Sequence, residues 1–281
     1  MRLYDTHCHF EAANRDEIRA ILARARAAGV EKLMAVGGSE ELNASAALAA
    51  EIAAEDAEGM PAVGVALGFD RDQVGLTTQL QASAFAPNGA MADKPSSKLQ
   101  APSTKHQAPT TNPPTTSPRA IGEIGLDYHY SPETRDAQRK LFGAQLEEAR
   151  RRGLPVVIHT READDDTLAL LREIPSRGII HCYTGTPEAA RQFLDLGFYI
   201  SFSGIVTFRL ADNVRAAAAV VPDDRILIET DSPFLAPVPL RGSRNEPAFV
   251  RHTCEFLAAL RGVAPDDFAA LTFANAERAF Q

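Results

Sequence analysis

The chain has 281 residues, of which 45% are hydrophobic, and a formal net charge of −8. This length suits one large domain with a sizeable core, and we expect a single domain over residues 1–281. The acidic balance argues against a protein that wraps duplex DNA through many phosphate contacts. Three cysteines cannot form a disulfide framework, and no run of 18 apolar residues occurs, so we expect a cytoplasmic monomer that does not cross a membrane.

Short apolar runs recur along the chain and predict eight strands. Runs such as "PVVIH" and "RILIET" are apolar throughout, as in parallel strands that are buried on both faces. The predicted strands are 3–7, 32–37, 62–68, 120–126, 155–159, 178–182, 198–203 and 225–230.

Amphipathic segments separate these strands and predict helices. Asn14 with Glu17 forms a capping-box pattern before an apolar face, and Gly29 is expected to end that helix. Ser131 and Thr186, each followed by proline, predict the starts of two more helices. This alternation favours an α/β fold of the (β/α)8 TIM-barrel type, with a doubly wound open sheet as the alternative.

Residues 76–118 differ from the rest of the chain in composition. They are rich in Pro, Thr, Ser, Ala and Gln and have almost no apolar periodicity. A segment of this kind cannot bury enough apolar surface to offset the entropy lost on ordering. We therefore predict a disordered insertion after the third strand, in place of the helix that would cover strands three and four.

Imidazole and carboxylate side chains collect near the ends of the predicted strands, where a barrel carries its chemistry. Each has a structural alternative, such as a hydrogen-bonded core histidine or, for Asp231, the cap of a turn. That all six lie at one rim by chance is far less expected than that any one of them does. They are His7 and His9 after the first strand, Glu123 in the fourth, His159 and His181 in the fifth and sixth, and Asp231 after the eighth.

Nitrogen and carboxylate ligands in this number suit two divalent first-row ions better than one. A bridging carboxylate can hold two such ions roughly 3.5–4 Å apart, and water between them loses its proton near neutral pH and becomes a nucleophile. The expected cofactors are therefore two divalent metal ions, with Mg²⁺, Mn²⁺, Zn²⁺ and Co²⁺ all open.

The segments "DTHCHF", "AIGEIGLDYHY", "LPVVIHTREADDDTL", "HCYTG" and "ILIETDSPFLAPVPLRGSRNEP" resemble the TatD family of metal-dependent deoxyribonucleases. The resemblance covers nearly the whole chain outside 76–118 and implies a TIM-type barrel. It also implies two-metal hydrolysis of nucleic-acid phosphodiesters in single strands or at 3′ ends. Carried over, His7, His9 and Asp231 hold one ion, His159 and His181 hold the other, and Glu123 bridges them. Asp231 is also the candidate for the base that orients the attacking water, so Glu123 and Asp231 are the expected catalytic residues.

The chain departs from the family pattern after the third strand. Members usually have Gly-x-His-Pro there, whereas this sequence reads "ALGFDRDQ", with Phe69 and Asp70 at the matching place. The resemblance implies that the histidine contacts substrate, so the departure affects the expected substrate class and rate more than metal binding. Arg161, two residues after His159, is a candidate for a bidentate contact with a substrate phosphate, with a rim salt bridge as the alternative.

Two other functions remain open at this point. An amidohydrolase-type enzyme that cleaves an amide, lactone or ester would need the same metals and water, and the acidic charge and the altered turn favour it. A non-catalytic scaffold is the third possibility, and the six ligand-type residues argue against it.

Overall fold

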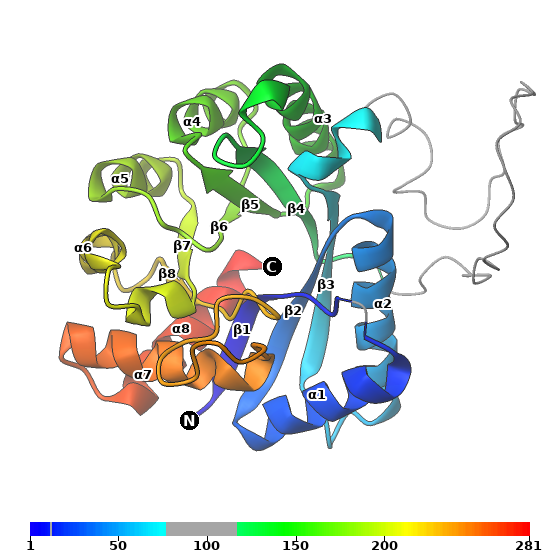
Figure 1. Ribbon diagram of the computed structural model, residues 1–281, viewed down its shortest axis with the longest axis vertical. Coiled ribbons are helices and arrows are strands. Elements are labelled where there is room, and N and C mark those ends of the chain that lie inside the picture. Colours follow the sequence, from blue (N-terminus) through cyan, green and yellow to red (C-terminus); the bar gives the residue numbers. More distant parts are fainter. Residues whose placement is uncertain (12, 77–116) are drawn as a thin grey trace, which may run out of the picture.

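The structure is a computed structural model that describes residues 1–11, 13–76 and 117–281, so the predicted insertion lies almost entirely outside the described residues. Eight parallel strands form one sheet in the order β1 to β8 (Figure 1). This confirms the predicted barrel, and the strand ends lie within two residues of those expected. The strands are β1 (Leu3–Cys8), β2 (Val30–Gly38), β3 (Ala62–Phe69), β4 (Ala120–Asp127), β5 (Val156–Arg161), β6 (Gly178–Ile180), β7 (Tyr199–Phe202) and β8 (Ile226–Ile228).

Contacts between the first and last strands bring the barrel close to closure. The hydroxyl of Thr6 donates to the carbonyl of Ile228 at 3.0 Å, and the His9 N–H donates to the carbonyl of Ser232 at 2.7 Å. The buried Asp5 carboxylate accepts from the backbone N–H and the hydroxyl of Thr230 at 2.9 and 2.6 Å. These bonds fix the end of β1 against the end of β8.

The helices surround the strands, as Figure 1 shows. The α-helices are α1 (Arg15–Ala27), α2 (Glu40–Glu55), α3 (Arg135–Arg152), α4 (Asp164–Glu173), α5 (Pro187–Asp195), α6 (Asp212–Val220), α7 (Val250–Arg261) and α8 (Pro265–Ala279). Short 3-10 helices are η1 (Arg71–Leu76), η2 (Pro132–Thr134), η3 (Gly204–Thr207) and η4 (Pro247–Phe249). Between β3 and β4, η1 is the regular element that the described residues contain.

Local signals explain most of the helix starts. The side chain of Asn14 accepts from the Glu17 N–H, and that of Thr186 accepts from the Ala189 N–H, so both predicted N-caps are confirmed. Ser131 is the N-cap of the 3-10 helix η2, which runs directly into α3, so the α-helix itself begins later than predicted, at Arg135, and the Ser131 side chain makes no capping hydrogen bond.

The barrel interior is a packed core that α8 closes from below. Inward side chains of the strands, among them Tyr4, Val157 and Leu227, form one buried cluster with Phe273 of α8 and Phe280 just after it. The rings of Tyr4 and Phe273 lie 5.7 Å apart. Apolar side chains therefore fill the end of the barrel opposite the predicted ligand residues. Within the described residues, no helix is long and apolar enough to span a membrane.

Candidate metal centre

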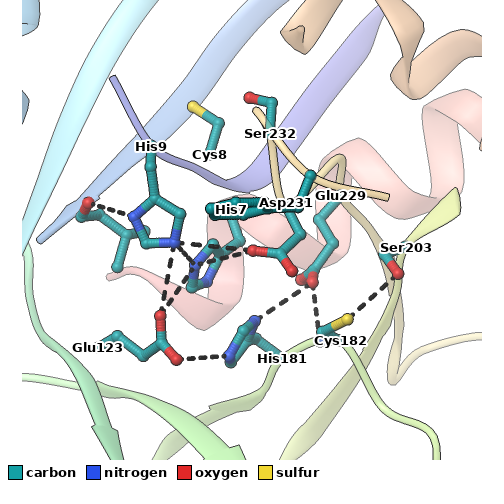
Figure 2. Close-up of polar contacts among 12 residues, drawn as sticks. His7, Cys8, His9, Glu123, His181, Cys182, Ser203, Glu229, Asp231 and Ser232 are labelled. Carbon is teal, nitrogen blue, oxygen red and sulfur yellow. Dashed lines mark hydrogen bonds and ion pairs between the residues drawn. The ribbon is translucent and has the colours of Figure 1, made fainter. Parts of the chain in front are cut away.

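The six predicted ligand residues meet at the C-terminal mouth of the barrel. A cavity of about 570 Å³ opens there, and five of the six line it, while His7 lies fully buried beneath. Figure 2 shows the Glu123 carboxylate facing His7 and His9 on one side and His181 on the other. The centre therefore has two halves that share one carboxylate.

The first half belongs to β1 and to the turn after β8. The Nε2 atoms of His7 and His9 lie 3.0 Å apart, and each is 3.5 Å from Oε2 of Glu123. Oδ1 of Asp231 lies 3.7 and 3.6 Å from the same two nitrogens. Asp231 has a φ of 55°, in the left-handed region that aspartate tolerates better than most residues, and its N–H donates to the His7 carbonyl.

The second half belongs to β5 and β6. Oε1 of Glu123 lies 3.3 Å from Nδ1 of His159 and 3.3 Å from Nε2 of His181. The two ring nitrogens are also 3.3 Å apart. Oε1 of Glu123 and the two ring nitrogens thus form the corners of a nearly equilateral triangle.

Glycines on either side of Glu123 allow this placement. A Cβ on Gly125, whose φ is +140°, would lie 2.0 Å from the carbonyl oxygen of His159, and a Cβ on Gly122 would lie 2.5 Å from Cβ of Val157. Any larger residue would therefore push β4 away from β5. The "GEIG" segment brings the Glu123 carboxylate and His159 of β5 within reach of each other.

Hydrogen bonds behind the rings turn the ligand nitrogens toward the centre. Nδ1–H of His9 donates to the Val36 carbonyl at 2.9 Å, because that oxygen can only accept. Nε2 of His159 faces the Asp127 carboxylate at 3.0 Å, and Nδ1 of His181 faces Glu229 at 3.3 Å. Such partners orient metal-binding histidines and raise their basicity.

The charges of the centre depend strongly on one another. Burial alone would raise the pKa of Glu123, but the charge of His181 and the hydrogen bonds from the histidines hold it well below its usual value. Burial would lower the pKa of His9, but hydrogen bonding to Asp231 and Glu123 outweighs this and raises it to about 10. Burial lowers the pKa of His7, and the charge of His181 adds to the effect. Positive charge between the carboxylates is therefore strongly favoured.

The ligand atoms fit divalent ions. Metal–nitrogen bonds of 2.0–2.1 Å in tetrahedral geometry place neighbouring ligand atoms about 3.3 Å apart, and the separations here run from 3.0 to 3.7 Å. Since neutral His9 has its lone pair on Nε2, its close approach to Nε2 of His7 calls for a proton or a cation between them. Two groups, His7/His9/Glu123 and Glu123/His159/His181, could each hold an ion.

A family model described as TatD related DNase matches residues 4–281. The chain belongs to this family. The uncharacterized metal-dependent hydrolase YcfH of Escherichia coli K12 is 52% identical over 164 residues, which are 57% of this chain and 62% of that relative, so the match spans about three fifths of YcfH. The 3'-5' ssDNA/RNA exonuclease TatD of Citrobacter rodentium is 38% identical over 170 residues, 57% of this chain and 64% of the relative. The crystal structure of YJJV, a TatD homolog of Escherichia coli K12, covers 99% of this chain and 98% of its own at 26% identity, with a TM-score of 0.76.

Two buried carboxylates of this TatD-family site were missed in the sequence. Asp127 is fully buried, its Oδ1 accepts from the backbone N–H groups of His129 and Tyr130, and its Oδ2 faces His159. Burial opposes its ionisation, but the bond to His159 outweighs this and lowers the pKa of Asp127 to about 2. Glu229 accepts from the Cys182 N–H at 2.7 Å. The alternation of side chains along a strand could have identified both residues in the sequence. Asp127 follows Glu123 by four residues and Glu229 precedes Asp231 by two, so an extended chain places each pair on one face.

The altered turn after β3 brings two charged residues to the TatD-family cavity. Asp70 lines the cavity, and burial, followed by the charge of Glu123, raises its pKa to about 6. The Arg71 guanidinium lies 3.6 Å from Asp127 and 3.8 Å from Glu123, and its buried Nε has no hydrogen-bond partner. In the sequence, Asp70 marks only the place of the missing histidine, and no motif points to Arg71.

Arg161, the predicted substrate contact, also lines the cavity. Its guanidinium lies over the ring of Tyr130 at 4.8 Å and donates to the Tyr130 hydroxyl at 3.4 Å. No carboxylate of the described residues forms an ion pair with it, so the structure does not favour the rim salt bridge that was the alternative.

Proposed function

We propose that the chain is a metal-dependent hydrolase that uses two divalent ions to cleave nucleic-acid phosphodiesters, in single strands or at 3′ ends. The observation that carries the proposal is the position of Glu123, whose two oxygens each face a different pair of imidazoles. One carboxylate between two ligand sets is the arrangement that a bridging ligand requires. In this proposal His7, His9 and Asp231 hold one ion, and His159 and His181 hold the other.

The ions, when bound, would lower the pKa of water and stabilise negative charge on the phosphate oxygens. Glu123 would fix the separation of the two ligand sets. The hydrogen bond from His9, outweighing burial, lowers the pKa of Asp231, so this carboxylate stays ionised at neutral pH. Because Asp231 also lines the cavity, it is placed to accept a proton from the attacking water.

Arginines at the cavity support a phosphate-containing substrate. Arg71 lies beside Glu123, and Arg161 lies at the rim without an acidic partner among the described residues. Guanidinium groups bind phosphate in a bidentate manner. The family description and the exonuclease name of the Citrobacter relative support the same substrate class.

The second candidate is an amidohydrolase-type enzyme for an amide, lactone or ester. Asp70 favours it, because this carboxylate lines the cavity where the family usually has a histidine. At neutral pH an acid with a pKa of about 6 is largely ionised and repels a phosphate group. Cytoplasmic location and a monomeric state rest on the sequence alone and stay predictions.

The experiment that tests the proposal is a substrate panel with purified protein. Single-stranded DNA, RNA, a simple phosphodiester, an amide and a lactone are each assayed with Mg²⁺, Mn²⁺, Zn²⁺ or Co²⁺ and with a chelator. We expect metal-dependent release of nucleotides by the wild type and almost none by Glu123→Gln. Equal release by both proteins would show contamination, and cleavage of the amide or lactone alone would replace the nuclease by the amidohydrolase.

A further inference from the structure

A second cavity adjoins the metal cavity on the β5 to α6 side of the rim. Its volume is about 630 Å³, and it shares Thr160, Arg161, Thr184 and Ile205 with the metal cavity. The two cavities therefore adjoin along these four residues. A ligand bound at the candidate metal centre can therefore extend toward the second cavity.

Three arginines line this second cavity, which we call the arginine pocket: Arg161, Arg209 and Arg241. None of them forms an ion pair with a carboxylate within the described part of the chain. Surface arginines elsewhere are often paired, as Arg150 is with Glu147 and Arg151 with Glu148. The unpaired guanidinium groups leave the pocket with positive charge on a chain whose net charge is −8.

Aromatic rings hold two of these cations without neutralising them. The Arg241 guanidinium lies 4.0 Å from the centre of the Phe208 ring, and that of Arg161 lies over Tyr130. A stacked guanidinium keeps its charge and most of its N–H donors for a ligand. The groups are thus oriented in advance for an anion.

The acidic residues of the arginine pocket are already engaged. Glu162 pairs with Nδ1 of His129 at 2.7 Å, and Asp164 accepts from the Thr160 hydroxyl at 3.0 Å. Large apolar side chains stand exposed along the same rim, with Tyr130 63% and Phe234 52% accessible. Exposed rings beside a positive groove are the two features that non-specific sites for single-stranded nucleic acid combine.

We propose that the arginine pocket binds the phosphate backbone of nucleotides adjacent to the scissile bond, so that the preferred substrate is a single-stranded oligonucleotide several residues long. This inference rests on the proposed nuclease function and extends it to the length of strand that is recognised. The strand runs from the paired ligand sets past Arg161 toward Arg209 and Arg241. Binding through backbone charge and stacking predicts little base preference.

The test compares two double variants that lose the same charge. Arg209→Ala/Arg241→Ala removes the two outer cations of the arginine pocket, and Arg150→Ala/Arg151→Ala removes two exposed arginines of α3. Binding of a fluorescein-labelled ten-nucleotide DNA strand is measured by anisotropy in chelator over a range of NaCl concentrations. We expect the pocket variant to bind about tenfold more weakly at low salt and its log–log salt slope to fall by about 1.4, two contacts at about 0.7 each.

A kinetic arm measures kcat/KM for a hexanucleotide relative to a dinucleotide. We expect this ratio to fall about tenfold in the pocket variant and to stay at the wild-type value in the α3 variant. An unchanged ratio and salt slope in the pocket variant, or an equal loss in the α3 variant, would overturn the inference and leave the nuclease function standing. If the wild type cleaves neither strand, the nuclease function fails, and the anisotropy arm still decides whether the pocket binds a strand.

Discussion

The two halves of the candidate metal centre share Glu123 but are built differently. The first half stands on β1 and the turn after β8, where backbone hydrogen bonds join the strand ends and the His7 side chain is 0% exposed. The second half stands on β5 and β6, and the His159 side chain is 19% exposed to the cavity. A backbone carbonyl lies behind His9, whereas buried carboxylates lie behind His159 and His181.

This difference should make the first half the more rigid and the second half the more reactive. The neutral backbone partner of His9 and the full burial of His7 fix the first half without adding charge. The carboxylates behind the second half make its imidazoles stronger donors, and the partial exposure of His159 opens that side to substrate and to exchange. We therefore expect the second half to respond more to its surroundings, and the first half to depend on barrel closure.

Replacement of the shared carboxylate should have the largest effect, because it belongs to both halves. We expect Glu123→Gln to reduce turnover by about 10³-fold, equivalent to about 4 kcal/mol, and to weaken metal binding in both halves. Nucleotide release and calorimetric metal titration measure the two effects, with Glu147→Gln on the exposed surface of α3 as the control. Weaker metal binding in one half alone would contradict a bridging role of Glu123.

Removal of one imidazole should separate the halves. We expect His9→Ala and His159→Ala each to lower the affinity for one ion by about a hundredfold or more. The other ion should stay bound, because the two halves share no ligand nitrogen. His181→Ala should follow His159→Ala. Metal content by mass spectrometry after dialysis measures this, and loss of both ions from His159→Ala would show that the halves are not independent.

Changes behind the ligands should affect the second half only. Asp127→Asn and Glu229→Gln keep the side-chain shape but remove the charge behind His159 and His181. We expect each to lower the affinity of the second ion about 10- to 100-fold. Calorimetry with the first site already filled tests this, and equal losses in both halves would mean that these carboxylates act through overall folding.

Proton release should give the smallest effect, and it reports on both halves, because, despite burial, the carboxylates raise the pKa of His9 and that of His181 above the usual value. The pKa of His9, about 10 without metal, lies above its usual value, so at pH 8 the ring carries a proton that a cation must displace. Affinity should therefore rise about tenfold per pH unit and level off near pH 10. Calorimetry at pH 8 in buffers of different ionisation enthalpy should show protons released when metal binds to each half; release near zero would mean that His9 and His181 titrate at their ordinary pKa.

The sequence by itself determined the barrel and the six side chains at its mouth. Apolar runs of strand length and helix caps such as Asn14 act over a few residues, so they can be read directly from the chain. The His7/His9 spacing and the family resemblance likewise identified the candidate ligands from the sequence. The structure brings these residues together. A helical segment does follow Ser131, but its first turn is a 3-10 turn, which has no distinct sequence signal, and the α-helix begins only after it.

Only the tertiary structure decided how these residues divide into two halves and what surrounds them. The contacts of the two Glu123 oxygens depend on the register of β4 against β5 and on the closure of β1 against β8. That closure joins residues more than 200 positions apart, as the bond between Asp5 and Thr230 shows. The roles of Asp127 and Glu229 depend on which ring nitrogen each one faces. Within the described residues Arg209 and Arg241 have no carboxylate partner, and this too depends on where the neighbouring carboxylates lie, because charge pairing is set by distances in space rather than by spacing along the chain.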